Sequence, residues 1–600
     1  MNKPIENYGI IGDLDTTALV GIDGSIDFMC FPHFDSPSLF ASLLDEKSGY
    51  FQIAPVSSES NNKQMYLPES NILLTRFLSD TGVGEISDFM VIEDSRHAHS
   101  LIRRVKCIRH SMQFKLQFRP RFDYARCKHE VKKEANGFLF IPENKKHPSI
   151  KLKTNKDLEI LEGDCEGVFE LQEGETAYFL LELASDEHTS HGFDEEDLVN
   201  SFKSTLNYWQ NWVEKSTYHG RWQEMVKRSA LTLKLLTSRK HGSIVAAPTF
   251  GLPEVIGGER NWDYRFTWIR DASFTLYALM RLGFTEESGQ FMNWLEQRCK
   301  ELEGGNTIQP IYGVDGRHVL TEEILDHMSG YQNSTPVRIG NAAYKQLQLD
   351  IYGELMDAVY MYDKFSPGIS FDLWESLKKL LEWMGDNWHK PDEGIWEVRS
   401  GPHHYLYSRF MCWVAVDRAI RLARRRSLSG PIDKWIKLRE EIHNDIIKNF
   451  WNEKLQSFVQ LKGSDTLDAS LLTMPLLRYI SPTDPKWMST LKAIDQNIVV
   501  DSLVFRYVNS DDHHDGLTGI EGTFNMCSFW YVEALARSGD VKKARFLFEK
   551  MLSYANHLGL YSEELSSRGL HIGNFPQAFT HIALISAAFE LNRRLNDQNL

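Results

Sequence analysis

Residues 523–556, TFNMCSFWYVEALARSGDVKKARFLFEKMLSYAN, contain two predicted helices, 523–538 and 540–556, joined by a tight turn at Ser538-Gly539. Two helices joined by so short a turn fold back on each other as an antiparallel hairpin. Beyond residue 220 the chain keeps this character, because apolar residues recur at the 3.6-residue period of a helix. The sequence therefore predicts a helical domain built from hairpins.

Short turns and long loops alternate between the predicted helices, so all the long loops lie at one end of the helical domain. Hairpins closed into a ring give an (α/α)6 barrel, and the end that carries the long loops is its candidate active face. A helical-repeat solenoid is the alternative, although no repeat motif recurs along the chain. The predicted helices are 222–239, 271–283, 285–302, 341–363, 371–388, 403–424, 431–450, 466–478, 486–497, 523–538, 540–556 and 576–594.

The first part of the chain, up to about residue 190, follows period two instead. Apolar residues from Met112 to Phe118 alternate with polar residues from Gln113 to Arg119, which is typical of a strand with one buried face. Many short strands without a long helical pattern favour an antiparallel β-sandwich. The chain is predicted to be a multidomain β + α protein: a β-sandwich over 1–193, a linker helix over 194–220 and the barrel over 221–600.

Composition excludes several classes of protein. The chain has 82 acidic and 67 basic residues, a net charge of −15, which argues against a nucleic-acid partner. No apolar stretch approaches the length of a membrane span, and the N-terminus lacks the apolar core of a signal peptide. Seven scattered cysteines show neither a zinc spacing nor a disulfide framework. We expect a cytoplasmic protein without a membrane or nucleic-acid partner; the oligomeric state is left open.

Two carboxylate motifs lie in different long loops: Trp396-Glu397 in DEGIWEVR and Glu563-Glu564 in GLYSEELSSRG. Two carboxyl groups on one face suit the cleavage of a glycosidic bond, because one protonates the leaving oxygen while the other activates water. Other long loops hold GGERNWDYRFTWIRDASF and the cluster DDHHD at 511–515. We interpret that cluster as a polar loop rather than a metal site, because it lacks a zinc spacing. Asp350 and Glu354, one helical turn apart, are interpreted as solvated or satisfied by their neighbours.

These motifs resemble those of glycoside hydrolase family 15, the glucoamylases and prokaryotic trehalases. NWDYRFTWIRDASFTLYAL resembles the segment that enters the family's barrel, DEGIWEVRSGPHHY its general-acid loop, and LYSEELSSRGLHIGNFPQAFTHIALISAA its general-base loop and final helix. The opening YGIIGDLDTTALVGIDGSIDFMCFPHFDSPSLFASLLD is similar to the β-sandwich domain of prokaryotic members. The resemblance covers nearly the whole chain and implies a β-sandwich followed by an (α/α)6 barrel.

The resemblance also implies roles for individual residues. Glu397 matches the general acid and Glu563 the general base, with the adjacent Glu564 as the alternative base. The matched sugar-binding residues are Arg270 and Asp271, the aromatic residues Tyr264 and Trp268, Trp396 beside the acid, and Arg506. Burial beside Trp396 is expected to raise the pKa of Glu397, whereas exposure of the Ser562–Arg568 loop is expected to keep Glu563 ionised. The family inverts the anomeric centre and requires no metal or organic cofactor.

The main hypothesis is an inverting exo-acting α-glucosidase of glucoamylase type, which releases β-glucose from α-glucans or malto-oligosaccharides. The alternative is a trehalase that uses the same two glutamates on α,α-trehalose, since the motifs line a glucose subsite common to both. A glycoside phosphorylase is disfavoured because it needs no base carboxylate. A non-catalytic carbohydrate-binding protein is disfavoured because both carboxylate motifs are present.

Overall fold

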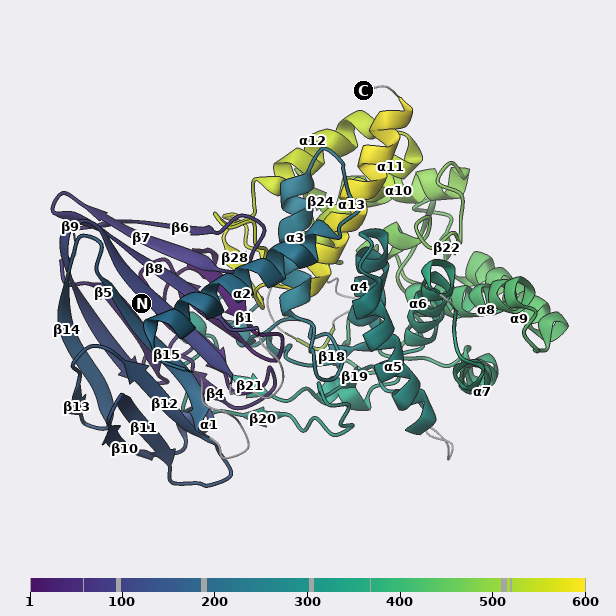
Figure 1. Ribbon diagram of the computed structural model, residues 1–600. Helices are drawn as coiled ribbons and strands as arrows, with labels where there is room; N and C mark the ends of the chain where they lie inside the picture. Colours follow the sequence, from purple (N-terminus) through teal and green to yellow (C-terminus); the bar gives the residue numbers. More distant parts are fainter. Residues whose placement is uncertain are drawn as a thin grey trace.

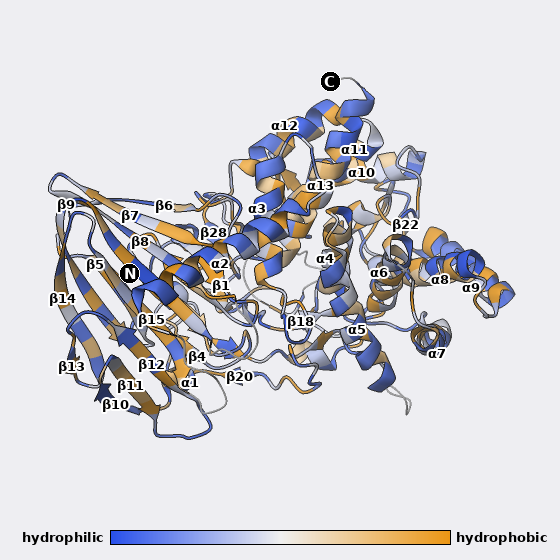
Figure 2. Ribbon diagram, in the orientation of Figure 1, coloured by the Kyte–Doolittle hydropathy of each residue, from blue (hydrophilic) through white to orange (hydrophobic). Residues whose placement is uncertain are grey.

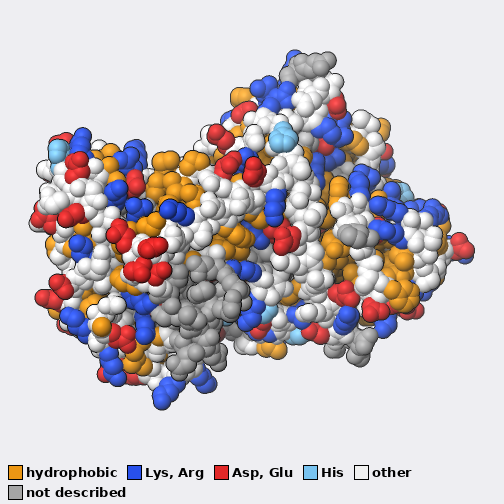
Figure 3. Space-filling view, in the orientation of Figure 1, with side chains coloured by type: hydrophobic (Ala, Val, Ile, Leu, Met, Phe, Trp, Pro, Cys, Tyr) orange, Lys and Arg blue, Asp and Glu red, His pale blue; other side chains and the backbone are white. Residues whose placement is uncertain are grey.

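A computed structural model describes residues 2–57, 59–92, 99–184, 192–301, 307–366, 368–508, 515–517 and 521–598. Figure 1 shows a β-sheet domain formed by the N-terminal part of the chain, beside a helical domain formed by the rest. Within the described ranges, no helix combines the length and apolar character needed to cross a membrane. Acidic and basic side chains are intermixed on the face seen in Figure 3.

The β-domain is one continuous antiparallel sheet of fifteen strands. The alternation predicted for residues 112–118 is present, because Met112, Phe114, Leu116 and Phe118 are buried while Gln113 and Lys115 are exposed. Hydrophilic and hydrophobic residues alternate along the strands in Figure 2. The strands are β1 (Tyr8–Gly12), β2 (Thr17–Gly21), β3 (Ser25–Cys30), β4 (Ser38–Phe40), β5 (Tyr50–Pro55), β6 (Asn61–Tyr66), β7 (Leu73–Ser79), β8 (Gly82–Met90), β9 (Ser100–Arg119), β10 (His129–Glu134), β11 (Gly137–Pro142), β12 (Ser149–Thr154), β13 (Glu159–Leu161), β14 (Asp164–Gln172) and β15 (Thr176–Ala184).

Strand β9 connects the two layers of this sheet. Its first half pairs with β8 and β15, and its second half pairs with β5 and β14. The layers pack face to face through aromatic rings: Phe118 of β9 lies 4.9 Å from Phe140 of β11, and Phe169 of β14 lies 5.4 Å from Phe179 of β15, measured between ring centroids. The predicted β-sandwich is therefore confirmed.

Helix α2 (Glu195–Glu214) follows the sheet and begins at an Asp194 cap, whose carboxylate accepts from the backbone N–H of Asp197. The sheet domain also holds the single turn α1 (Phe122–Ala125). The helical domain contains α3 (Gln223–Leu235), α4 (Ile269–Arg281), α5 (Thr285–Glu301), α6 (Ile351–Phe365), α7 (Phe371–Asn387), α8 (Leu406–Arg426), α9 (Ile432–Asn449), α10 (Pro485–Asn497), α11 (Asn525–Ser538), α12 (Val541–Leu552) and α13 (Ala578–Asp597). The boundaries proposed at residues 193 and 220 stay a prediction.

Inner and outer helices differ in how much of their surface is buried. Every residue of α11 from Asn525 to Ala536 is buried, as expected for a helix surrounded by others. Helix α9 instead buries Trp435, Leu438, Ile442 and Ile446, one stripe spaced by three and four residues. The inner elements pack in a ring, with α13 against α4, α4 against α6, α6 against α8, and α11 against both α13 and the 3-10 helix η4 (Ala469–Thr473). The (α/α)6 barrel is confirmed.

Two predicted helices differ from the structure. The helix predicted over 466–478 is only η4, because Pro475 lacks an N–H and cannot continue an α-helical ladder. The helix predicted from residue 341 begins at Ile351. Before it, the N–H groups of Leu347 and Leu349 bond to the carboxylates of Glu393 and Asp392, at 3.0 and 2.9 Å, instead of to a helical carbonyl.

Short strand pairs and 3-10 turns shape the loops at the barrel end. The strands are β16 (Phe250–Pro253), β17 (Asn261–Asp263), β18 (Thr267–Trp268), β19 (Ile311–Tyr312), β20 (Glu323–Ile324), β21 (Arg338–Ile339), β22 (Trp451–Asn452), β23 (Ser457–Phe458), β24 (Val499–Val500), β25 (Leu503–Val504), β26 (Thr523–Phe524), β27 (Glu564–Leu565) and β28 (His571–Ile572). The remaining 3-10 turns are η1 (Ile5–Asn7), η2 (Tyr331–Asn333) and η3 (Ala342–Lys345).

Candidate active site

The predicted site residues come from loops that lead into the N-terminal ends of inner helices. Glu397 precedes α8, Glu563 precedes α13, and Arg506 precedes α11. Arg270 and Asp271 lie in the first turn of α4. The alternation of short turns and long loops therefore placed these residues at the correct end of the barrel.

Glu397 is held by two side chains of the α4 entry segment. Its Oε1 accepts a hydrogen bond from the indole N–H of Trp268 at 2.6 Å and lies 3.6 Å from Nη1 of Arg270. Burial raises the pKa of Glu397, while Arg270 and the Trp268 hydrogen bond oppose that rise. The residue has a φ of +56°, a left-handed conformation that is uncommon outside glycine and is concentrated at functional sites. The expected rise in the Glu397 pKa is present.

Glu563 is buried, with only 2% of its surface exposed, whereas 18% of the Glu397 side chain is exposed. Oε1 of Glu563 accepts from the Tyr264 hydroxyl at 2.7 Å and from Nε2 of Gln577 at 3.3 Å. Burial raises the pKa of Glu563 to about 7, although the Tyr264 hydrogen bond lowers it. The expectation that solvent exposure keeps this carboxyl ionised is therefore wrong: the loop after Ser562 folds into the strand pair β27–β28, and Glu563, just before β27, is buried.

The aromatic residues that hydrogen-bond to the two glutamates are in contact with each other. Tyr264, the partner of Glu563, and Trp268, the partner of Glu397, contact each other edge to face with ring centroids 5.4 Å apart. Only 1% of the Trp268 surface is exposed, so its indole contacts Glu397 but presents no open ring face on which a sugar could stack. Glu564 is fully buried in β27, and neither of its carboxylate oxygens has a hydrogen-bond partner within the described residues. Because neighbours on a strand point to opposite faces, only Glu563 reaches Tyr264.

Arg270 joins the proposed acid to a second group of buried carboxylates. Its guanidinium contacts Asp271 at 2.9 Å and donates to the backbone carbonyl of Ile395 at 2.6 Å. Asp350 and Glu354 are 0% and 2% exposed, and the charge of Arg270 opposes the rise in their pKa values that burial causes. Of the two readings of this pair, solvation is wrong because both acids are buried, whereas Glu354 is satisfied in part by a neighbour, the Tyr407 hydroxyl at 3.2 Å. An i, i+4 pair of acids gives no sequence signal of burial, so only the packing of α6 reveals it.

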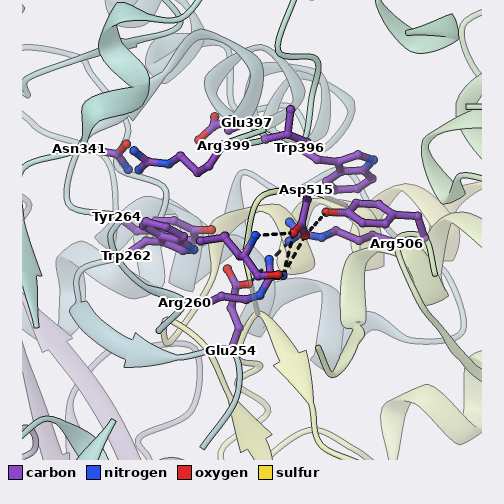
Figure 4. A pocket seen from close by; sticks show the side chains of 13 residues that line it. Glu254, Arg260, Trp262, Tyr264, Asn341, Trp396, Glu397, Arg399, Arg506 and Asp515 are labelled. Atoms are coloured by element: carbon purple, nitrogen blue, oxygen red, sulfur yellow. Dashed lines mark hydrogen bonds and ion pairs between the residues drawn. The ribbon is translucent and has the colours of Figure 1, made fainter. Parts of the chain in front are cut away.

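A pocket opens beside Glu397, and Figure 4 shows how its walls face one another. Trp262 and Tyr264 lie side by side on one wall, opposite Trp396 and Arg506. Sequence reasoning missed several of its residues, although most lie next to quoted motifs. The pocket is lined by Glu254, Arg260, Trp262, Tyr264, Asn341, Trp396, Glu397, Val398, Arg399, Arg506, Tyr507, Asp515 and Leu517.

The floor of this pocket is a network of buried ion pairs. Arg506 donates to Glu521 at 2.7 Å through Nε and lies 3.7 Å from Glu254. Arg260 pairs with Glu521 at 2.6 Å and with Asp515 at 2.9 Å. Arg506 thus reaches the pocket, as predicted, but its nitrogens are largely engaged by acids. Of the DDHHD cluster, residues 511–514 lie outside the described residues, and Asp515 pairs with the Arg260 guanidinium and accepts from the Tyr507 hydroxyl.

The β-sandwich contacts the site through Arg265, a fully buried residue. Its guanidinium pairs with Asp263 at 2.6 Å and donates to the Ser36 carbonyl at 2.7 Å and to the Tyr124 hydroxyl at 3.1 Å. Asp263 and Arg265 flank Tyr264, the hydrogen-bond partner of Glu563. Side chains and backbone of the sandwich therefore fix the segment that orients one of the two glutamates.

Comparison with known proteins agrees with this geometry. Residues 220–589 match Glycosyl hydrolases family 15, and residues 1–163 match a trehalase-like N-terminal domain. A trehalase of Mycolicibacterium smegmatis is 38% identical over 98% of this chain and 91% of its own length. A trehalase of Thermoplasma volcanium is 36% identical over 98% of this chain and 94% of its own.

A solved structure has the same fold. A bacterial glucoamylase complexed with acarbose superposes with a TM-score of 0.72 and 14% identity, covering 98% of this chain and 94% of the other. At that identity the likeness concerns the fold alone. The full-length family match, together with two glutamates at one end of an (α/α)6 barrel, leads to one conclusion: the chain is a glycoside hydrolase and belongs to glycosyl hydrolase family 15.

Proposed function

We propose that the protein is a trehalase that hydrolyses α,α-trehalose to glucose. The observation that carries the proposal is the pair of glutamates, the partly exposed Glu397 and the buried Glu563, each held by one member of the Tyr264–Trp268 pair. Relatives that match almost the whole chain bear the name trehalase, which supports this substrate over the α-glucans of a glucoamylase. That the protein lies in the cytoplasm and acts there on a small substrate stays a prediction.

In this mechanism Glu397 is the general acid. Trp268 occupies Oε1, so the proton is carried by the other oxygen, and burial raises the pKa of Glu397, which favours its protonated form. As the bond between the anomeric carbon and the bridging oxygen breaks, that oxygen takes the proton from Glu397. The departing product is then a neutral glucose rather than an alkoxide, and such proton transfer typically accelerates the step by about 10²- to 10⁴-fold.

Glu563 is the general base. Tyr264 and Gln577 hold its Oε1, whereas Oε2 has no hydrogen-bond partner within the described residues and is left to accept a proton from water. The water oxygen bonds to the anomeric carbon from the face opposite the departing sugar, and its proton passes to Glu563. This course inverts the anomeric centre. Arg270 and Asp271 are proposed to bind the hydroxyls of the glucose that is attacked.

The departing sugar is proposed to lie against Trp262 and Arg399. The guanidinium of Arg399 stacks on the Trp262 ring at 4.8 Å, and that of Arg338 lies 4.9 Å from the same ring. The β20–β21 segment that carries Arg338 is tied to the sandwich by the Arg126–Glu323 ion pair at 2.7 Å. A polar wall fixed in this way suits one short, hydroxyl-rich sugar better than a long glucan.

A proton NMR time course with trehalose, maltose and maltoheptaose in parallel tests the proposal. We expect trehalose to yield equal amounts of α- and β-glucose at early times, because inversion converts only the sugar that is attacked. Release of β-glucose from the maltose series without turnover of trehalose would instead identify a glucoamylase. Turnover only when phosphate is supplied as the nucleophile would remove the hydrolytic mechanism.

Glu397→Gln provides the control in that experiment. It keeps the shape and loses the proton, so kcat should fall by about 10²- to 10⁴-fold while the Kd for trehalose changes little. Glu453→Gln, the same substitution at an exposed residue, should leave both values unchanged. Retained turnover in Glu397→Gln would remove Glu397 from its role.

A further inference from the structure

A second cavity, of about 270 Å³, lies at the other end of the barrel. It is lined by the C-terminal ends of the inner helices, with Tyr277 and Arg281 from α4, Arg418 from α8, Arg537 from α11, and Arg593 from α13 among its residues. At 1.5 Å per residue, Arg281 lies roughly 17 Å along α4 from Arg270. The cavity is therefore separate from the catalytic pocket. A single buried water needs only roughly 10–15 Å³, so this space exceeds an ordinary packing defect.

The lining of this cavity is strongly basic. Seven cations face it, against two carboxylates. They are Arg281, Lys364, Arg418, Arg421, Arg478, Arg537 and Arg593, and the carboxylates are Asp357 and Glu590.

Part of this charge has a structural explanation. Arg418 is buried and pairs with Asp357 at 2.6 Å, and Arg537 pairs with Glu533 at 2.6 Å. Cations also favour the C-terminal ends of helices because of the helix dipole. These pairs account for the buried arginines, which frame the cavity and keep its shape.

Three of the cations have no carboxylate partner within the described residues: Arg281, Lys364 and Arg478. Arg281 donates to the Tyr277 hydroxyl at 3.1 Å and lies over the rings of Tyr277 and Phe589, so its guanidinium is held in place beside the cavity without being neutralised. Arg478 has a φ of +62°, in the chain segment that follows η4. Arg281 is thus held by aromatic rings rather than by an acid, whereas Arg478 and Lys364 are exposed side chains beside the cavity; all three keep their charge for a ligand.

We propose that this cavity binds a small soluble anion that carries a phosphate group. The planar fork of arginine matches two phosphate oxygens at once, and Arg281 and Arg478 offer two such forks. Tyr277 and Tyr360, which also line the cavity, offer hydroxyls to the rest of the ligand. A phosphorylated sugar combines both features, and inorganic phosphate shares only the first.

Isothermal titration calorimetry on the full chain, at fixed ionic strength, tests the proposal with inorganic phosphate and with glucose 6-phosphate as probes. At least one probe should bind with a Kd below about 1 mM. The double variant Arg281→Gln/Arg478→Gln should weaken that Kd at least about tenfold, because two charged hydrogen-bond donors are lost. Arg424→Gln is the matched control, since Arg424 lies near the end of the same helix as Arg421 but does not line the cavity; its Kd should equal that of the wild type.

Two further arms separate the outcomes. The titration is repeated in Glu397→Gln saturated with trehalose, where binding must persist if the ligand lies away from the catalytic pocket. If the double variant does not fold, Lys364→Gln replaces it, because Lys364 is an exposed residue. This variant should also weaken binding of the probe. Tighter binding of glucose 6-phosphate than of phosphate identifies a sugar phosphate as the ligand. A Kd that is unchanged in the variants, or a Kd above about 1 mM for both probes, would overturn the proposal.

Discussion

Replacing Tyr264 by Phe removes one hydroxyl and, with it, the shortest hydrogen bond to the proposed base. That bond, 2.7 Å from the Tyr264 oxygen to Oε1 of Glu563, stabilises the ionised carboxylate and not the neutral acid. Its loss should therefore raise the pKa of Glu563 above the value of about 7 that burial and its partners give it. The second donor, Gln577, remains at 3.3 Å.

The size of the effect follows from the kind of bond. A hydrogen bond to a charged group contributes about 1.5–3 kcal/mol. Since 1.36 kcal/mol corresponds to one pKa unit, the acidic limb of the kcat/KM profile should move upward by about one to two pH units. At pH 6, roughly ten- to hundredfold less of the variant would carry an ionised Glu563 than of the wild type, by the same relation.

The assay is the pH profile of kcat/KM for trehalose, recorded across pH 5 to 10 in buffers of constant ionic strength. Tyr407→Phe is the matched control: it removes a hydroxyl that bonds at 3.2 Å to Glu354, another buried carboxylate, and should not move the acidic limb. If the limb of Tyr264→Phe stays within about 0.3 pH units of the wild type, then Glu563 does not control it and is not the base.

Three other perturbations separate competing explanations. Glu563→Gln should lower kcat by about 10²- to 10⁴-fold. The kcat of Glu564→Gln should stay within about tenfold of the wild type, because burial raises the pKa of Glu564 so far that a neutral amide resembles its protonated form. Equal losses of kcat in the two variants would contradict this. Arg265→Met breaks a fully buried ion pair and should lower the free energy of unfolding, measured in urea, by about 3–5 kcal/mol. Arg317→Met, the control at a half-exposed ion pair, should lower it by roughly 1 kcal/mol or less. Similar losses in both variants would show that Arg265 does not anchor the site to the sandwich. Burial opposes protonation of His99, but the Asp13 carboxylate at 2.6 Å raises the His99 pKa above 6.5. The wild type should therefore be more stable than His99→Gln, fully so below pH 6.5, and this advantage should vanish as pH rises through the folded pKa. A difference in melting temperature that grows with pH would exclude this.

The helical domain was predictable because its evidence is local. Hydrophobic period and turn length are properties of neighbouring residues, so they indicated both the hairpins and the end of the barrel that carries Glu397 and Glu563. The prediction failed at η4, where a proline within an apolar run stops the α-helix, and before α6, where carboxylates of a distant loop capture the backbone N–H groups of Leu347 and Leu349.

The chemistry of the site depends on contacts between residues far apart in the chain. Tyr264 and Glu563 are 299 residues apart, and Trp268 and Glu397 are 129 apart, so no local pattern relates them. Burial is likewise decided by packing: it raises the pKa of Glu563 to about 7, although its loop is polar in sequence. Sequence alone determined the barrel and pointed to the two glutamates as the predicted acid and base, because periodicity and motifs are short-range. Only the tertiary structure decided their protonation and orientation, because desolvation and hydrogen bonding arise when distant segments meet.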